Sequence, residues 1–450
     1  MKDMPMHQLP LELFEVIVDH LPRDRLDNEK DLKTVSLVCS AFRHPCQQRL
    51  FSYIQLDRPS ETPQSVVLPG RKLLALFEHS PKLARYVQGL EMGDSDGVGW
   101  IHQDEDLPRA LNVIVQHHNI RHLGLACLNP FSTIPPATKQ AIATIFASRS
   151  FHSLYLHQTP ISVVTWCKPS LTHLELDCIE DTEDDWTDLR PLDGPLGLQF
   201  LSVPQGDVAG TIEYLLQPEW IDLQNLKELF VSAKSAGGTA HFESITRLFS
   251  ACPATLETLW YAMWSLRHAP VGPDGNLFGS VLAKMRAQDL VDFSRFSTLR
   301  NITLSNLVVC NTKTRDSILP FVTRLRNLSA PHVVETIRLI VRHGEIGNRP
   351  HLYEPPNADH WGQLDLLLTD KLRFARLKCV TIEIQTMGIS AGAESLNGLA
   401  KARKDIASLL PGIQEAGILE MKAEEWYPYW PQAWERWFNS PWGGLGFLYP

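Results

Sequence analysis

Most of the chain repeats one short pattern of apolar positions. An apolar residue is followed, three and five positions later, by two more, as in Ile120, Leu123 and Leu125. Because side chains along a strand alternate between its two faces, the second and third of these residues share one face. Further copies of this signature begin at Phe151, Leu171, Leu198, Leu226, Leu256, Leu299, Val334 and Leu377. An earlier copy is expected at 90–92 and a last one at 418–421, so the pattern predicts a long series of short strands.

Helical stretches separate the copies of the signature. A strand with a single apolar face cannot stand alone, whereas parallel stacking of successive strands buries a continuous spine that the helices cover from outside. The step from Phe151 to Leu171 is less than half of the step from Leu256 to Leu299, so the repeat is irregular. The sequence therefore predicts an α/β fold over residues 57–425 that resembles an irregular leucine-rich-repeat solenoid with inserted loops.

Three short helices are predicted before this array. The first spans Pro10 to Leu21 with an apolar stripe, and a charged loop follows it. The second covers about Asp31 to Phe42, and the third begins at Pro45, since proline suits the first turn of a helix. So few residues bury little apolar area by themselves, and the module needs either the following domain or a partner to cover its apolar faces.

The order of residues in this module resembles the F-box family. The matching positions, in sequence order, are Leu9-Pro10, Glu12, Ile17, Leu21-Pro22, Asp31-Leu32, Val35, Leu37-Val38-Cys39, Phe42-Arg43 and Leu50-Phe51. The resemblance covers residues 6–56. It departs from the family pattern at Phe42, where tryptophan is common, and in the length of the loop before Asp31.

The resemblance implies a docking role for the N-terminal module. F-box proteins bind a Skp1-type adaptor, which joins them to a cullin-based ubiquitin ligase, and the chain is then its substrate receptor. The docking residues that the resemblance implies are Leu9, Pro10, Leu13, Ile17, Leu21, Leu32, Val35, Val38 and Cys39. Alternatively, the same residues pack the three helices against one another.

A protein target is expected on the sheet face that points away from the helices. The fifth position of each signature lies on that face and carries three aromatic residues, Tyr155, Phe230 and Trp260. Aromatic side chains dominate binding hot spots, so we expect these three, with Glu175 and Arg338, to contact the target. The alternative is that inserted loops cover them or that a shifted register turns them inward.

Composition excludes several other classes of function. A formal net charge of −9 argues against a general nucleic-acid binder, and no uninterrupted apolar window predicts a membrane span. The eight cysteines have no spacing typical of metal ligands, so no metal or cofactor is expected. The first residues do not resemble a signal peptide, and we expect a cytoplasmic or nuclear protein with reduced thiols.

No nucleotide-binding, hydrolase or metalloprotease motif appears, so a non-catalytic receptor is expected. Two rivals stay open: an F-box scaffold that acts outside a ligase, and an α/β enzyme with an unrecognised site.

The acidic stretch 180–188 is interpreted as a solvated loop or as a binding site for a basic target segment. The tryptophan-rich residues 426–450 are read as a cap on the array or as a binding patch.

Overall fold

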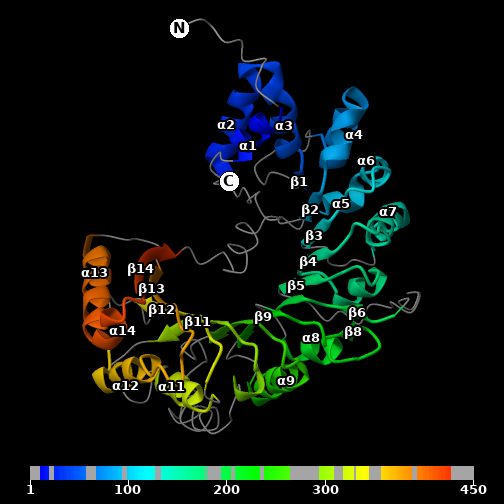
Figure 1. Cartoon of the computed structure of the whole chain (residues 1–450). Coiled ribbons are helices and arrows are strands. Elements are labelled where there is room, and N and C mark those ends of the chain that lie inside the picture. The colour runs from blue at the N-terminus through cyan, green and yellow to red at the C-terminus, as the bar shows by residue number, and fades with distance from the viewer. Residues whose placement is uncertain are drawn as a thin grey trace, which may run out of the picture. The chain divides into compact units, whose positions relative to one another are not determined.

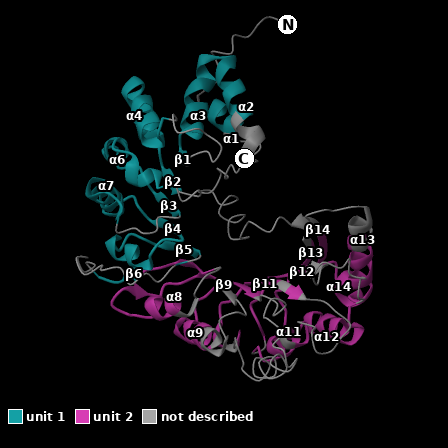
Figure 2. Ribbon diagram, turned by 180° about the vertical axis from the view of Figure 1, so that it is seen from behind, with its two compact units in different colours: residues 1–196, 431–450 teal, residues 197–430 magenta. Residues whose placement is uncertain are grey.

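The computed structural model places the chain in two compact units, residues 1–196 with 431–450 and residues 197–430 (Figure 2). The residues that the structure describes are 11–19, 25–56, 67–93, 99–126, 133–177, 179, 194–203, 208–233, 238–263, 293–308, 318–328, 331–343, 356–387 and 393–426. The acidic stretch 180–188 and nearly all of the tryptophan-rich segment lie outside them.

The first unit begins with three helices, α1 (Leu11–Asp19), α2 (Arg25–Val38) and α3 (Ser40–Leu50). The charged stretch predicted to be a loop is helical from Arg25 onward. Its Arg, Leu, Glu and Lys residues are good helix formers, which favours a longer helix. The prediction of a second helix from Asp31 to Phe42 is therefore wrong at both ends.

The break between α2 and α3 lies at Cys39, whose backbone is extended (φ −158°, ψ 166°). The third helix starts at Ser40, and Pro45 lies inside it rather than at its beginning. An internal proline gives up one helix hydrogen bond, and Pro45 is buried, so its packing offsets that loss.

Five parallel strands follow in the first unit, each beside the next in chain order. They are β1 (Tyr53–Leu56), β2 (Gly89–Gly93), β3 (His122–Ala126), β4 (Ser153–His157) and β5 (His173–Asp177). The connections between them form α4 (Pro69–His79), η2 (Pro81–Tyr86), α5 (Trp100–Gln103), α6 (Leu107–Val115), α7 (Pro136–Phe146) and η4 (Ile161–Trp166). Helices α4, α6 and α7 lie on one side of this sheet (Figure 1).

The second unit continues the pattern with seven parallel strands in chain order among its described residues. They are β7 (Phe200–Val203), β9 (Glu228–Ala233), β10 (Thr258–Met263), β11 (Asn301–Val308), β12 (Thr336–His343), β13 (Cys379–Met387) and β14 (Leu419–Trp426). The helices are α8 (Val208–Leu215), α9 (Gly238–Ala251), η7 (Phe293–Arg295), α11 (Ile318–Arg326), α12 (Ala358–Leu368), α13 (Ala393–Ser408) and α14 (Pro411–Glu415). Two strands of two residues each, β6 (Leu196–Gly197) and β8 (Ile221–Asp222), complete the described elements.

The strand register follows the apolar signature. Leu229, Leu259 and Ile302, the fourth positions of three successive copies, lie side by side and are buried. Every predicted copy forms a strand, which confirms an α/β fold of parallel strands with helices. The sequence analysis missed β1, although Phe51, Ile54 and Leu56 carry the same signature, so the sheet begins before residue 57.

Buried carboxylates fix two of the helix starts. Asp104 accepts a hydrogen bond of 2.6 Å from the N–H of Gly70 in the first turn of α4, and burial raises the pKa of its carboxyl. A Cβ atom at Gly70 would lie 2.6 Å from the Cα of Leu107, so glycine is required there. In the second unit, Asp365 of α12 accepts from the N–H groups of Gly412 and Ile413 at the start of α14.

Candidate functional site

The three N-terminal helices have a small core of their own. Val18, Leu32 and Cys46 form its centre, and half-buried apolar side chains surround them. The ring of Phe14 packs edge-on against that of Phe42, with 4.8 Å between the ring centroids. One face of α1, defined by Phe14 and Val18, is therefore used inside the module.

A second apolar face of α1 points outward. Leu13, Val16 and Ile17 stand at positions i, i+3 and i+4 of the helix and so lie on one side of it. Leu13 and Ile17 are each 44% exposed, although the inner face of the same helix is buried. When a helix has apolar residues on both sides, the outer residues add no stability unless another surface covers them.

The end of α2 adds two more exposed apolar side chains, Leu37 and Val38, and Leu37 is 81% exposed. We call Leu13, Val16, Ile17, Leu37 and Val38 the outer apolar set. It holds five of the eight large hydrophobic side chains found exposed in the described part of the chain. Scattered exposed leucines are ordinary, but a concentration in two short helices is typical of an interaction surface.

The nine residues that the F-box resemblance assigned to docking divide into three groups. Leu13, Ile17 and Val38 belong to the outer apolar set, whereas Val35 and Cys39 are half-buried. Leu32 is only 1% exposed, so it stabilises the module and cannot meet a partner while the module is folded. Leu9, Pro10 and Leu21 lie outside the described residues.

The docking residues named from the sequence did not include Val16 or Leu37, although Leu37 is one of the positions that match the F-box pattern. The spacing of Val16, three residues after Leu13, was the signal that could have found it. The spacing of residues gave no such signal for Leu37, because on its helix Leu37 lies away from the stripe that Leu32 and Val35 define.

The module attaches to the rest of the first unit through α3, which contacts η2. The rings of His44 and Tyr86 meet edge-on, with centroids 5.5 Å apart. Arg49 of α3 donates a hydrogen bond back to the carbonyl of Val18 in α1. Attachment through α3 leaves the outer side of α1 and the end of α2 exposed.

The second predicted site, the fifth-position column, has the expected register. In the second unit Ser202, Phe230, Trp260, Thr303 and Arg338 follow one another across neighbouring strands. In the first unit Gly124, Tyr155 and Glu175 do the same. The column predicted from the sequence is thus confirmed as a set of neighbours.

The aromatic members of this column are nevertheless buried. Trp260 is 2% exposed, its ring meets that of Phe230 edge-on at 5.2 Å, and its Nε1–H donates to Ser305 Oγ at 3.1 Å. Tyr155 is also buried, with its ring stacked on that of His157. Tyr155, Phe230 and Trp260 are thus buried in the register that was expected, and their contact with a target stays a prediction.

Arg338 is engaged in an internal network as well. Its Nε–H and Nη2–H both donate to Glu383 Oε2, and Glu383 Oε1 accepts a further hydrogen bond from Gln385. The guanidinium carbon lies 5.8 Å from the centre of the Trp260 ring, which adds a cation–π contact. Arg338 thus neutralises a buried carboxylate while its own side chain stays partly exposed, and its contact with a target stays a prediction.

On the sheet face of the first unit, burial favours the uncharged forms of Glu175, His122 and His173. Glu175 is buried, its Oε1 has no hydrogen-bond partner, and burial with the neighbouring Asp177 raises its pKa to about 8. Burial, aided by His152 and His173, lowers the pKa of His122 to about 3, and burial lowers that of His173 to about 4. Glu175, the remaining predicted target contact, is therefore enclosed and prefers its proton.

No three His, Cys, Asp or Glu side chains in the described ranges come together in a group that could hold a metal ion. The cysteines seen there are free, and burial raises the pKa of Cys252 to about 12. Within those ranges, too, no helix combines the length and the apolar character needed to cross a membrane.

A comparison with protein-family models finds no match for the chain, and a comparison with curated proteins finds none either.

Proposed function

We propose that this chain is an F-box protein, the substrate receptor of a Skp1–cullin ubiquitin ligase. The observation that carries the proposal is the outer apolar set, which α1 and α2 expose although their inner faces are already buried. Three of its members, Leu13, Ile17 and Val38, are positions at which the F-box resemblance expects adaptor contacts. The adaptor would cover these side chains and complete the module.

The mechanism of such a receptor is proximity. The module holds the adaptor, the remainder of the chain holds a target, and the ligase brings target lysines near activated ubiquitin. Tethering raises the effective concentration of the reacting groups, so no side chain of this protein has to take part in making or breaking a bond.

The proposal is tested by a pull-down of purified chain with a Skp1-type adaptor. The variant Ile17→Asp/Val38→Asp places two charges in the outer apolar set, and we expect it to lose adaptor binding by a factor of about ten or more. Both side chains are exposed in the free chain, so the variant should fold normally, which circular dichroism would check.

A matched control carries the same kind of change elsewhere. Leu366 and Leu372 are exposed leucines of the second unit, and Leu366→Asp/Leu372→Asp should bind the adaptor as the wild type does. If Ile17→Asp/Val38→Asp binds the adaptor undiminished, the docking assignment fails. Recovery of adaptor without cullin from a reconstituted mixture would instead favour an F-box scaffold that acts outside a ligase.

A further inference from the structure

The parallel sheet of the second unit ends at β14. Among the described strands β14 has β13 on one side and no strand on the other, so the backbone N–H and C=O groups of its outer edge are available for pairing. Its charged residues Glu420 and Lys422, which form an ion pair, lie on the face opposite to α13. Such charges discourage unselective pairing at an exposed strand edge.

The apolar spine of the sheet is incomplete at this end. Leu419 and Met421 continue the columns of Val380 and Ile382, which are fully buried, yet both are only half-buried. Side chains that have the position of core residues but remain partly exposed mark a surface that one more element could cover.

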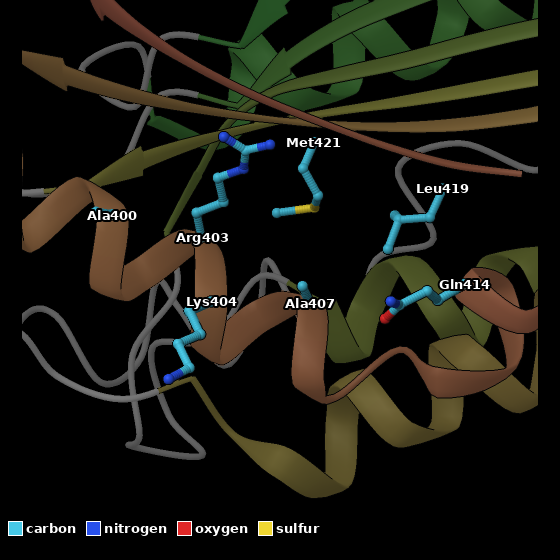
Figure 3. Close-up of a pocket in the computed structure, with 7 residues that line it drawn as sticks. All are labelled: Ala400, Arg403, Lys404, Ala407, Gln414, Leu419 and Met421. Carbon is cyan, nitrogen blue, oxygen red and sulfur yellow. The ribbon is translucent and has the colours of Figure 1, made fainter. Parts of the chain in front are cut away.

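A hollow of about 370 Å³ lies beside these two side chains (Figure 3). Ala400, Arg403, Lys404 and Ala407 line it from α13, where the spacing i, i+3, i+4, i+7 places them on one face of the helix. Leu419 and Met421 point into the hollow from β14, and Gln414 of α14 borders it. The opposite face of α13, with Ala402 and Ile406, is buried.

The hollow is positively charged at its rim. Arg403 extends from α13 toward the strand on the side of Met421, whereas the side chain of Lys404 points away from the strand (Figure 3). Both side chains are exposed, and neither forms an ion pair or hydrogen bond within the described part of the chain. In contrast, Arg247, Arg300 and Arg338 of the same unit each pair with a carboxylate.

We infer that this hollow binds an extended acidic–apolar peptide segment of a partner protein, which adds to the sheet as a strand beside β14. The free edge supplies main-chain hydrogen bonds, and alternate side chains of the peptide fall on the side of Leu419, Met421 and α13. Apolar side chains there would cover the end of the spine, and a carboxylate would meet the guanidinium of Arg403 in a charge-assisted hydrogen bond. The inferred site therefore places target recognition at the end of the sheet and not at the buried aromatic residues of the fifth-position column.

The test is a fluorescence-anisotropy titration of the full chain with a labelled, acetylated probe peptide. The probe alternates threonine with leucine and carries glutamate at one leucine position. We expect saturable binding, weakened about tenfold or more by Arg403→Glu, because the charge-assisted bond becomes a repulsion. Lys371→Glu, which makes the same charge change at an exposed site outside the hollow, should leave the affinity unchanged.

Two altered peptides separate charge from strand pairing. A lysine in place of the glutamate should abolish binding to the wild type and restore it to Arg403→Glu. A proline in place of a central threonine removes a main-chain donor and should weaken binding by about tenfold.

Absence of binding at about 1 mM probe would overturn the inference, as would equal binding to the wild type and to Arg403→Glu. Equal affinity of the proline peptide would overturn strand addition. Self-association of the wild type that Arg403→Glu removes in sedimentation would show a second copy, not a partner, at this edge. None of these measurements involves the adaptor, so their failure and that of the proposed function remain distinguishable.

Discussion

Two regions of this molecule carry apolar side chains in places where a binding surface was expected, and the protein uses them in opposite ways. The outer apolar set of α1 and α2 is exposed, while Phe230 and Trp260 on the sheet face are buried against each other and against polar neighbours. A helix has room for two apolar faces, of which a small module can fill only one. A sheet face lined by large neighbouring side chains can bury them against one another. Exposure, more than residue type, distinguishes these two regions.

The largest expected change in stability comes from a substitution among the buried aromatic residues of the sheet face. Trp260→Ala removes a buried ring together with its contacts to Phe230, Ser305 and Arg338, and should lower the free energy of unfolding by about 3–5 kcal/mol. Urea denaturation followed by circular dichroism measures the change. A loss below about 1 kcal/mol would mean that Trp260 is not part of a packed core.

The sheet face of the first unit offers a test by pH. The pKa of Glu175 is raised from 4.5 to about 8 in the folded chain, so the unfolded chain releases this proton first. Its contribution to stability is complete below about pH 4.5 and is lost as the pH rises toward 8. Glu175→Gln should therefore be more stable than the wild type at pH 8, by on the order of 2–4 kcal/mol, with little difference at pH 4.

Denaturant midpoints of the two proteins measured across this pH range give the comparison. A constant difference between them would show that Glu175 is ionised in the folded chain or in contact with solvent. The buried histidines of the same face act in the opposite sense, since a lowered histidine pKa costs stability as the pH falls below 6.5. Because they are present in both proteins, their contribution cancels in the difference.

The smallest effect is expected from the outer apolar set. Leu13→Ser should change the free energy of unfolding by less than about 0.5 kcal/mol, because this residue is already 44% exposed to water. The adjacent Phe14→Ser is the matched control and should cost about 3 kcal/mol or more, since Phe14 is buried against Phe42. Two neighbouring residues with similar losses in thermal denaturation would contradict the assignment of two faces to α1.

The parts of this structure that could be predicted from the sequence are those that depend on the spacing of apolar residues close together in the chain. The apolar signature located the strands and even the neighbours across the sheet, because period two and parallel stacking leave one consistent register. Helix ends in the module were harder, since Pro45 resembles a helix start and the charged residues after Arg23 resemble a loop. The buried packing of Pro45 inside α3 explains the first case, and the high helix propensity of the residues from Arg25 onward explains the second.

For the candidate sites, the F-box resemblance implied Leu13, Ile17 and Val38, which are exposed, but equally Leu32, which is not. The sequence held no sign that Glu383 needs Arg338, because the two stand on different strands far apart in the chain. The hollow beside β14 could not be predicted either, since its residues come from two helices, α13 and α14, and from one strand, which only folding brings together.

The paired hydrogen bonds of Asp365 have a mechanical consequence. They fasten α14 to α12 and bypass α13, so α14 cannot detach from α12 without leaving a buried carboxylate bare. Linear arrays ordinarily fray from their ends, where each unit has one neighbour. Here α14 is braced to α12, so a pulling force applied at residue 426 should first break the pairing of β14 with β13 and then meet a second resistance at this brace.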